Sequence, residues 1–229
     1  MGSSRRLIAV VTTMVATFAF ASGQGAYAAT FADGFEGYPV GQAWPDGTTH
    51  GPWRAVYNGY GTTSIERDGT NVLSLSPAAA SRAAETHAAL VRTTQTFADL
   101  DLSVRLRTVA QLRSGTPPNP WEVGWVLWHY GDDTHFYYLA LKPNGWEFGK
   151  EDPAYPGAQR FLGGDYSPAF AVGPWHTVRV QQSGATMTLW GDGSVLGSFT
   201  DGERPYLNGA IGLYTEDARV HVDSVNVTD

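Results

Sequence analysis

The chain of 229 residues carries 22 acidic and 15 basic side chains, a formal net charge of −7, and it contains no cysteine. The acidic balance argues against nucleic acid and against anionic membranes as partners. Because cysteine is absent, a disulfide framework and thiol catalysis are both excluded.

The first 29 residues are organised like a secretory signal peptide. Arg5 and Arg6 precede an apolar stretch over residues 7–20, and Ala26-Tyr27-Ala28 supplies the small residues of a cleavage site. That stretch is too short for a comfortable membrane span, so a retained membrane anchor is the weaker alternative. We predict a signal peptide over residues 1–29, a secreted, extracellular protein, and one domain over residues 30–229.

The remaining chain consists of short apolar runs separated by Gly, Pro, Asn and Asp. No segment keeps a helical period for three turns, and this spacing is typical of an antiparallel sandwich. We therefore predict an all-β, antiparallel β-sandwich whose strands are Val72–Ser76, Ala88–Phe97, Leu102–Val109, Val123–Tyr130, Phe136–Leu141, Glu147–Lys150, His176–Gln182, Thr186–Gly191, Ser194–Thr200, Ala210–Tyr214 and Arg219–Val227.

Alternation along these strands predicts which side chains face the core. Burying Leu102, Val104 and Leu106, for example, turns Arg105 and Arg107 to the other face. The same reasoning gives one predicted outward set: Arg105, Arg107, Glu122, Trp128, Tyr138, Lys142, Glu147 and Tyr214. If the strands share a concave sheet, these side chains form a binding cleft; on a convex sheet they are only an unusual surface.

The second half of the chain resembles concanavalin-A-like jelly rolls. The resemblance rests on Glu122-Val-Gly-Trp-Val-Leu-Trp128, on Asp133-Thr-His-Phe-Tyr-Tyr-Leu139, on Gly173-Pro-Trp-His-Thr-Val-Arg-Val180, and on the segment from Gly209 to Asp223. Within that superfamily the chain is similar to glucuronan lyases and to the cellulose-induced, calcium-binding jelly-roll proteins of cellulolytic fungi. The resemblance implies a secreted, carbohydrate-active protein with a polysaccharide partner, a groove for it and one structural calcium ion.

The calcium site that the resemblance implies joins the two ends of the domain. Asp33-Gly-Phe-Glu36 and Asp223 resemble its two halves, and Asp68-Gly-Thr-Asn71 is an oxygen-rich loop that completes it. The predicted ligands are Glu36, Asp68, Asn71 and Asp223. The alternative is that Asp33, Asp68 and Asn71 are ordinary turn residues.

For function we favour β-elimination of a uronic-acid-containing, glucuronan-like polysaccharide by a monomer, an activity that serves plant cell wall degradation. Such a lyase neutralises the uronate and needs a group that moves the C5 proton. The predicted catalytic residues are His87, Arg105, Arg107, Tyr138, Lys142 and Tyr214, and the predicted substrate-binding residues are Glu122, Trp128 and Glu147.

Two alternatives stay open. The Glu-x-Asp-x-x-Glu motif of laminarinase-type hydrolases and the signatures of alginate lyases are both absent from the sequence. A hydrolase would then use Glu122 and Glu147 as its carboxylate pair. A non-catalytic glycan-binding module would need neither signature.

Overall fold

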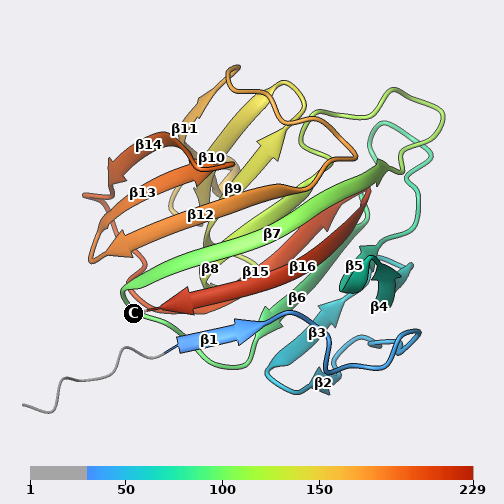
Figure 1. The fold of residues 1–229 in the computed structure, drawn as a ribbon. Helices are drawn as coiled ribbons and strands as arrows, with labels where there is room; N and C mark the ends of the chain where they lie inside the picture. The colour runs from blue at the N-terminus through green and yellow to red at the C-terminus, as the bar shows by residue number, and fades with distance from the viewer. Residues whose placement is uncertain (1–29, 229) are drawn as a thin grey trace, which may run out of the picture.

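Two eight-stranded antiparallel sheets packed face to face make up the computed structural model, which describes residues 30–228 (Figure 1). Sheet A runs β14 (Ser194–Thr200), β13 (Thr186–Gly191), β12 (His176–Ser183), β7 (Leu100–Gln111), β16 (Ala218–Thr228), β5 (Thr70–Ser76) and β4 (Thr62–Asp68), and β1 (Thr30–Asp33) also pairs with β16. Sheet B runs β11 (Gln159–Asp165), β10 (Gly145–Glu151), β9 (His135–Lys142), β8 (Gly124–Asp132), β15 (Ala210–Glu216), β6 (Ala88–Thr93), β3 (Trp53–Tyr57) and β2 (Thr49–His50).

The predicted β-sandwich is confirmed, and the predicted strands correspond to β5–β10 and β12–β16. The prediction missed β1 to β4 and β11. Of these, β4 reads TTSIERD and β11 reads QRFLGGD, so their polar and glycine residues hide the alternation that marks a strand. The predicted signal peptide lies outside residues 30–228, and within that range no helix is long and apolar enough to cross a membrane.

The main core lies between the two sheets. Leu102, Val104 and Leu106 of β7 point into it, as alternation predicted. The ring of Trp128 packs there against both Tyr137 and Phe148, at 5.5 and 5.8 Å between ring centroids. These side chains remove large apolar areas from water and dominate the stability of the sandwich.

A second apolar cluster covers the outer face of sheet B. It is built around Leu90, Trp125, Leu127, Tyr130 and Tyr138. Sheet B is therefore apolar on both faces, and the first seven residues of β8 are all buried. An outer sheet face normally carries polar residues, so this cluster distinguishes sheet B from an ordinary solvent-exposed sheet.

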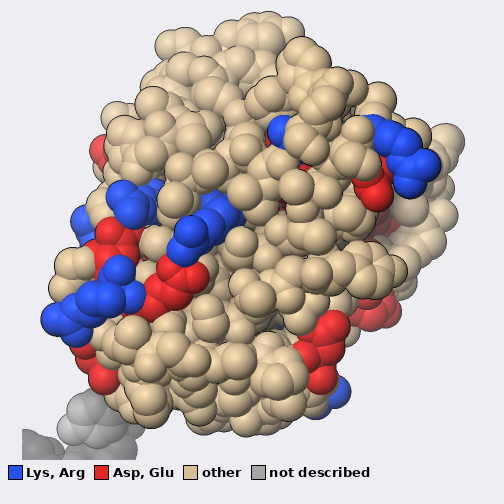
Figure 2. Space-filling view, turned by 90° about the vertical axis from the view of Figure 1, so that its right-hand side faces the viewer, with Lys and Arg blue, Asp and Glu red and all other residues tan. Residues whose placement is uncertain are grey.

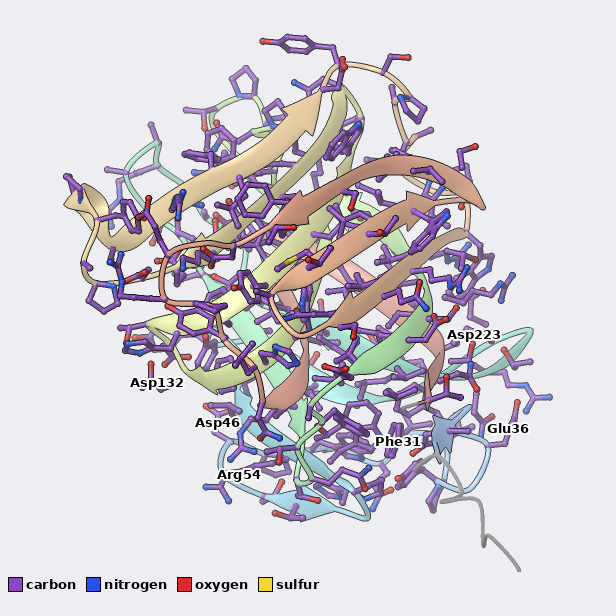
Figure 3. All side chains as sticks on the ribbon, turned by 90° about the vertical axis from the view of Figure 1, so that its left-hand side faces the viewer. Phe31, Glu36, Asp46, Arg54, Asp132 and Asp223 are labelled. Carbon is purple, nitrogen blue, oxygen red and sulfur yellow. The ribbon has the colours of Figure 1, made fainter. Side chains whose placement is uncertain are left out.

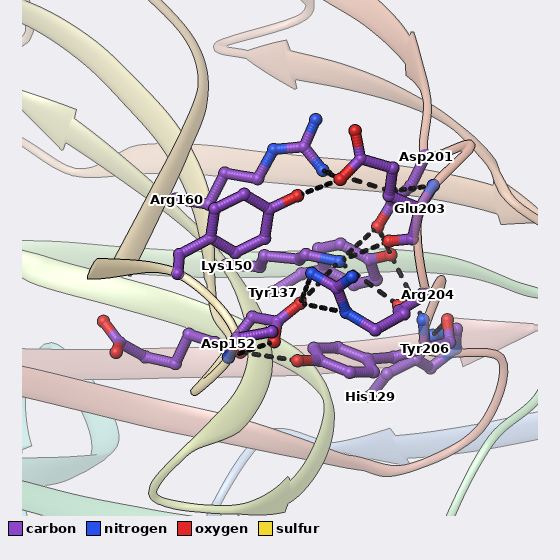
Figure 4. A network of polar contacts seen from close by, with 12 residues as sticks. His129, Tyr137, Lys150, Asp152, Arg160, Asp201, Glu203, Arg204 and Tyr206 are labelled. Carbon is purple, nitrogen blue, oxygen red and sulfur yellow. Dashed lines mark hydrogen bonds and ion pairs between the residues drawn. The ribbon is translucent and has the colours of Figure 1, made fainter. Parts of the chain in front are cut away.

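One buried charge stands out in the interior. Lys150 of β10 is fully buried, and its Nζ donates to Asp201 Oδ2 at 2.7 Å and to the carbonyl of Glu203 at 2.9 Å (Figure 4). The Tyr137 hydroxyl donates to the same Asp201 oxygen at 2.7 Å. These contacts tie β10 and β9 to residues 201–206, the segment that follows β14.

We predict that Asp201→Asn destabilises the protein by about 3–5 kcal/mol, because it removes the nearer of the two carboxylates that pair with the buried ammonium of Lys150 and leaves Asp152, at 3.4 Å, as the remaining one. Chemical denaturation of the two proteins measures the difference. Asp101→Asn is the matched control, since the Arg179–Asp101 pair is partly exposed, with 43% and 29% of the two side chains accessible. Its loss should stay within about 1 kcal/mol. Equal effects of the two substitutions would contradict the prediction.

Candidate functional site

The outer face of sheet B carries two adjoining pockets, of about 380 and 270 Å³. Phe136, Glu151 and Tyr214 line both of them. The larger pocket extends toward Trp121, Trp125, Glu147, Gln159, Phe161 and Glu216, and the smaller toward Tyr57, Leu90, Leu127, Tyr130 and Asp133. We call the two pockets together the sheet B groove.

Aromatic rings form the floor of the groove because neighbouring strands place them in register. Tyr214 of β15 lies opposite Trp125 of β8, and Leu127 lies opposite Tyr138 of β9. The Trp125 and Tyr138 rings stack at 4.6 Å between centroids, and Tyr214 meets Trp125 edge-on at 5.5 Å. Tyr138 is fully buried in this layer, whereas Trp121 and Phe161 of the larger pocket are 42% and 64% exposed and are suited to packing against the faces of sugar rings.

Glu151 is the groove carboxyl with the most unusual environment. Among the described residues its side chain has no hydrogen-bond or ion-pair partner. Burial, with a smaller contribution from the negative charge of Glu216, raises the pKa of Glu151 to about 7. A carboxyl that titrates near neutral pH can accept a proton and then return it, as a general base and acid must.

Glu216 is a second carboxyl that lines the larger pocket. Its Oε1 accepts a hydrogen bond from the Tyr214 hydroxyl at 2.7 Å, and burial is the main cause of a raised pKa. The next residue, Asp217, accepts from Arg113 at 2.7 Å, and Arg113 also pairs with Glu122 at 2.5 Å. All three side chains of this ion cluster are at most 2% exposed. The cluster therefore fixes the β15–β16 turn that presents Glu216.

Glu147 differs from Glu151 because its charge is neutralised. Its Oε2 pairs with Lys142 Nζ at 2.6 Å, and its Oε1 accepts from the Tyr138 hydroxyl at 3.1 Å. Burial raises the pKa of Tyr138 far above its ordinary value. Four of the residues selected from the sequence, Tyr138, Lys142, Glu147 and Tyr214, are thus together on one sheet face.

The predicted position of the two arginines beside these residues is wrong. Arg105 and Arg107 do point outward, but from β7 of sheet A, where they pair with Asp223 and Asp68. Both guanidinium groups also lie over the Trp175 ring. In Figure 2, basic and acidic side chains interleave on the left of the view, the side of sheet A that faces the viewer in Figure 1.

Trp128 and Glu122 were also predicted to face outward, and both are buried. Trp128 belongs to the core, where its indole N–H donates to Gln182 at 2.7 Å. Glu122 is the ion partner of Arg113. His87 lies just before β6, close to Glu85 and the carbonyl of Ala78, and lines neither pocket. The pair Glu122 and Glu147 therefore does not assemble as a hydrolase site.

The four predicted calcium ligands lie near one another, on the side away from the groove. Figure 3 shows Glu36 and Asp223 on the right of the view and Asp132, which ends β8 of sheet B, on the left. Glu36 accepts from the backbone N–H of Asn71 at 3.0 Å. However, three of these four side chains already have cationic partners. Arg105 donates to Asp223 and Arg67 donates to the amide oxygen of Asn71. Asp68 contacts both Arg107 and His221.

These cationic partners do not fit an all-oxygen calcium shell. Within residues 30–228 no group of three or more His, Cys, Asp or Glu side chains is arranged to hold a metal. Calcium binding stays a prediction, and no step of the chemistry below depends on it.

Residues 42–228 match the family model described as a 3-keto-alpha-glucoside-1,2-lyase-like domain. The chain belongs to this family. Among curated proteins none matches the sequence. The predicted concanavalin-A-like jelly roll of a carbohydrate-active protein is confirmed.

Solved structures show the same fold at low identity. The carbohydrate binding module CBM66 from Bacillus subtilis has a TM-score of 0.58 and 13% identity over 78% of this chain and 96% of its own. A Bacillus licheniformis beta-glucanase has a TM-score of 0.53 and 14% identity over 87% and 98%. A GH16 protein from Bacteroides ovatus, crystallised with a product, has a TM-score of 0.56 and 10% identity over 86% and 99%.

Sequence reasoning missed Glu151, although the signal was present. Glu147, Gly149 and Glu151 alternate on one face of β10, so extending the predicted strand by one residue places both carboxylates together. Glu216 was missed for the same reason at the end of β15.

Gly149 makes room for the Tyr138 ring, and this suggests a test of how the groove floor is built. A Cβ at Gly149 would lie 2.5 Å from the Tyr138 hydroxyl oxygen and 2.7 Å from the carbonyl oxygen of Arg160. We predict that Gly149→Ala costs about 1–3 kcal/mol of unfolding free energy through overpacking. Gly37→Ala is the control, since nothing lies within 4 Å of its Cβ position. An unchanged stability of Gly149→Ala would show that the floor is not closely packed.

The raised pKa of Glu151 also has a consequence for stability. Because the folded state holds the proton up to about pH 7 and the unfolded state releases it near 4.5, stability falls as pH rises through that window. Glu151→Gln cannot ionise, so its stability relative to the wild type should increase between pH 5 and pH 8. Denaturant unfolding at both values measures this difference. Glu203→Gln, at an exposed carboxyl whose pKa is lowered, should show no such gain.

Proposed function

We propose that this protein cleaves a glycosidic bond of a neutral saccharide by β-elimination, with Glu151 as the general base. The observation that carries the proposal is the unpaired Glu151 carboxyl, with its pKa raised to about 7, inside an aromatic groove. The family description supports the reaction type, because it names a lyase that acts between C1 and C2 of a 3-keto-alpha-glucoside.

The position of the ketone, at C3 of the sugar ring, determines the chemistry. A carbonyl at C3 acidifies the proton at C2, and the glycosidic oxygen at C1 is then positioned β to the carbonyl. Glu151 removes the C2 proton, the C–H electron pair forms the C1=C2 double bond through an enolate, and the C1–O bond breaks. The leaving oxygen takes up a proton and departs as an alcohol, so the elimination needs neither water nor an oxidant.

The leaving oxygen also needs a proton. The negative charge of Glu216 helps to raise the pKa of Glu151, so Glu216 acts in its ionised form. The proton for the leaving oxygen then comes from Glu151 or from solvent. The hydroxyl of Tyr214 holds Glu216 in place through its hydrogen bond.

A neutral substrate suits the groove better than the uronate favoured by the sequence. Its lining carries Glu147, Glu151, Glu216 and Asp133, whereas none of the residues lining the two pockets is Lys or Arg. Arg105 and Arg107, the expected uronate partners, project from sheet A. A carboxylate on the substrate would therefore meet like charges, which disfavour its binding.

The second candidate function is a glycan-binding module. The exposed rings of Trp121 and Phe161 in the larger pocket favour it, and one protein of the same fold is a carbohydrate binding module. Product release distinguishes the two functions, because a binding module retains the sugar and releases no product, whereas a lyase releases one.

We predict that Glu151→Gln lowers the rate of elimination by about 10²–10⁴-fold, since it removes the base but keeps the shape of the side chain. The assay uses the 3-keto form of methyl α-glucoside and follows the absorbance of the unsaturated ketone that elimination creates. In the wild type the rate should rise with pH through about 7, as Glu151 loses its proton. Arg105→Ala is the control and should keep the wild-type rate. Loss of activity in the Arg105 variant, or full activity in the Glu151 variant, would refute the proposal.

A further inference from the structure

A third hollow, of about 640 Å³, lies beside the groove along the edge strand β11. It shares Glu147 and Phe161 with the larger groove pocket, so the two hollows adjoin each other. Phe161 lies at this junction with 64% of its surface exposed. We call the third hollow the edge pocket.

Two glycines of β11 line this space. Gly164 lies opposite Glu147, and Gly163 lies opposite Phe148. A Cβ at Gly164 would lie 2.9 Å from the carbonyl oxygen of Trp146. Close approach of the two backbones therefore favours glycine at this position, and the Glu147 carboxylate remains open to the edge pocket.

Tyr166 also lines the edge pocket and offers an aromatic surface. The residue is 84% exposed, yet its backbone packs against the β9–β10 turn. Gly145 in that turn has φ +134°, and a Cβ there would collide with the carbonyl oxygen of Asp165 and lie 2.7 Å from the Tyr166 Cα. The ring is thus carried by a closely packed backbone while its faces stay accessible.

The polar groups of the edge pocket suit hydroxyl groups. Lys142, Asn144 and Asp165 line it and offer both donors and acceptors. Lys142 is already neutralised by Glu147 at 2.6 Å, so the pocket carries no strong excess of positive charge. Exposed aromatic rings beside mixed polar groups, rather than a closed apolar cavity, are the chemistry that recognises a sugar ring.

We propose that the edge pocket is a distal sugar subsite, which binds a second saccharide ring of the same substrate beyond the ring that reacts at Glu151. This inference rests on the proposed function and makes it more specific, because the substrate becomes an oligosaccharide rather than a simple glycoside. Tyr166 supplies the stacking surface, and Asn144 and Asp165 bind the hydroxyl groups.

The test compares two substrates of different length, the 3-keto forms of methyl α-glucoside and of maltotriose, oxidised on the non-reducing ring. In the wild type kcat/KM should be higher for the longer substrate. Tyr166→Ala should lower the ratio of kcat/KM for the maltotriose substrate to kcat/KM for the methyl glucoside substrate roughly three- to tenfold. This is the loss expected for one aromatic contact. Tyr60→Ala removes an aromatic side chain that is 90% exposed and lies outside the edge pocket, and it should leave the ratio unchanged.

The remaining outcomes also test the proposal. If Tyr166→Ala leaves the ratio unchanged, whether both kcat/KM values stay the same or fall equally, the subsite is overturned. If the wild type eliminates neither substrate, the proposed reaction is wrong, and calorimetric binding of unmodified maltotriose then tests the subsite by itself. Weaker binding of maltotriose to Tyr166→Ala than to the wild type would support it; equal affinities, or no binding to the wild type, would refute it.

Discussion

The buried ion pair of Lys150 with Asp201 determines which face of β10 belongs to the groove. Side chains alternate along a strand, so an inward Lys150 requires that Glu147 and Glu151 point outward. A register shift by one residue would move the ammonium away from Asp201 and leave an uncompensated charge in the interior, at a cost of several kcal/mol. The interior contact of one lysine thereby fixes the orientation of the two groove carboxylates.

A second buried ion cluster lies next to Glu216 in the chain. Arg113 holds both Glu122 and Asp217, and it also donates to the carbonyls of Arg82 and Glu85. This connects three loops that lie far apart in the sequence. Because Glu216 adjoins one of these loops, its position depends on side chains that themselves make no contact with the groove.

The groove is kept at a cost to stability. Glu151 and Glu216 are partly buried with raised pKa values, so their charged forms are disfavoured in the folded protein. A second apolar cluster on sheet B surrounds them and limits access of water. Together these features give a site in which a carboxyl can exchange a proton near neutral pH, which a fully hydrated surface carboxylate does not do.

The sequence by itself determined the all-β class, most strand positions and the inward or outward direction of β7, β9 and β15, because a period of two is a local property. It could not assign the faces of β8, since Trp125 and Trp128 lie on opposite faces and both are buried. Only the tertiary structure decided that Arg105 and Tyr138 belong to different sheets, because strand order depends on pairing between residues distant in the sequence. The tertiary structure also decided that no described residue pairs with the Glu151 carboxyl, because this depends on which charged groups the folded chain brings near it.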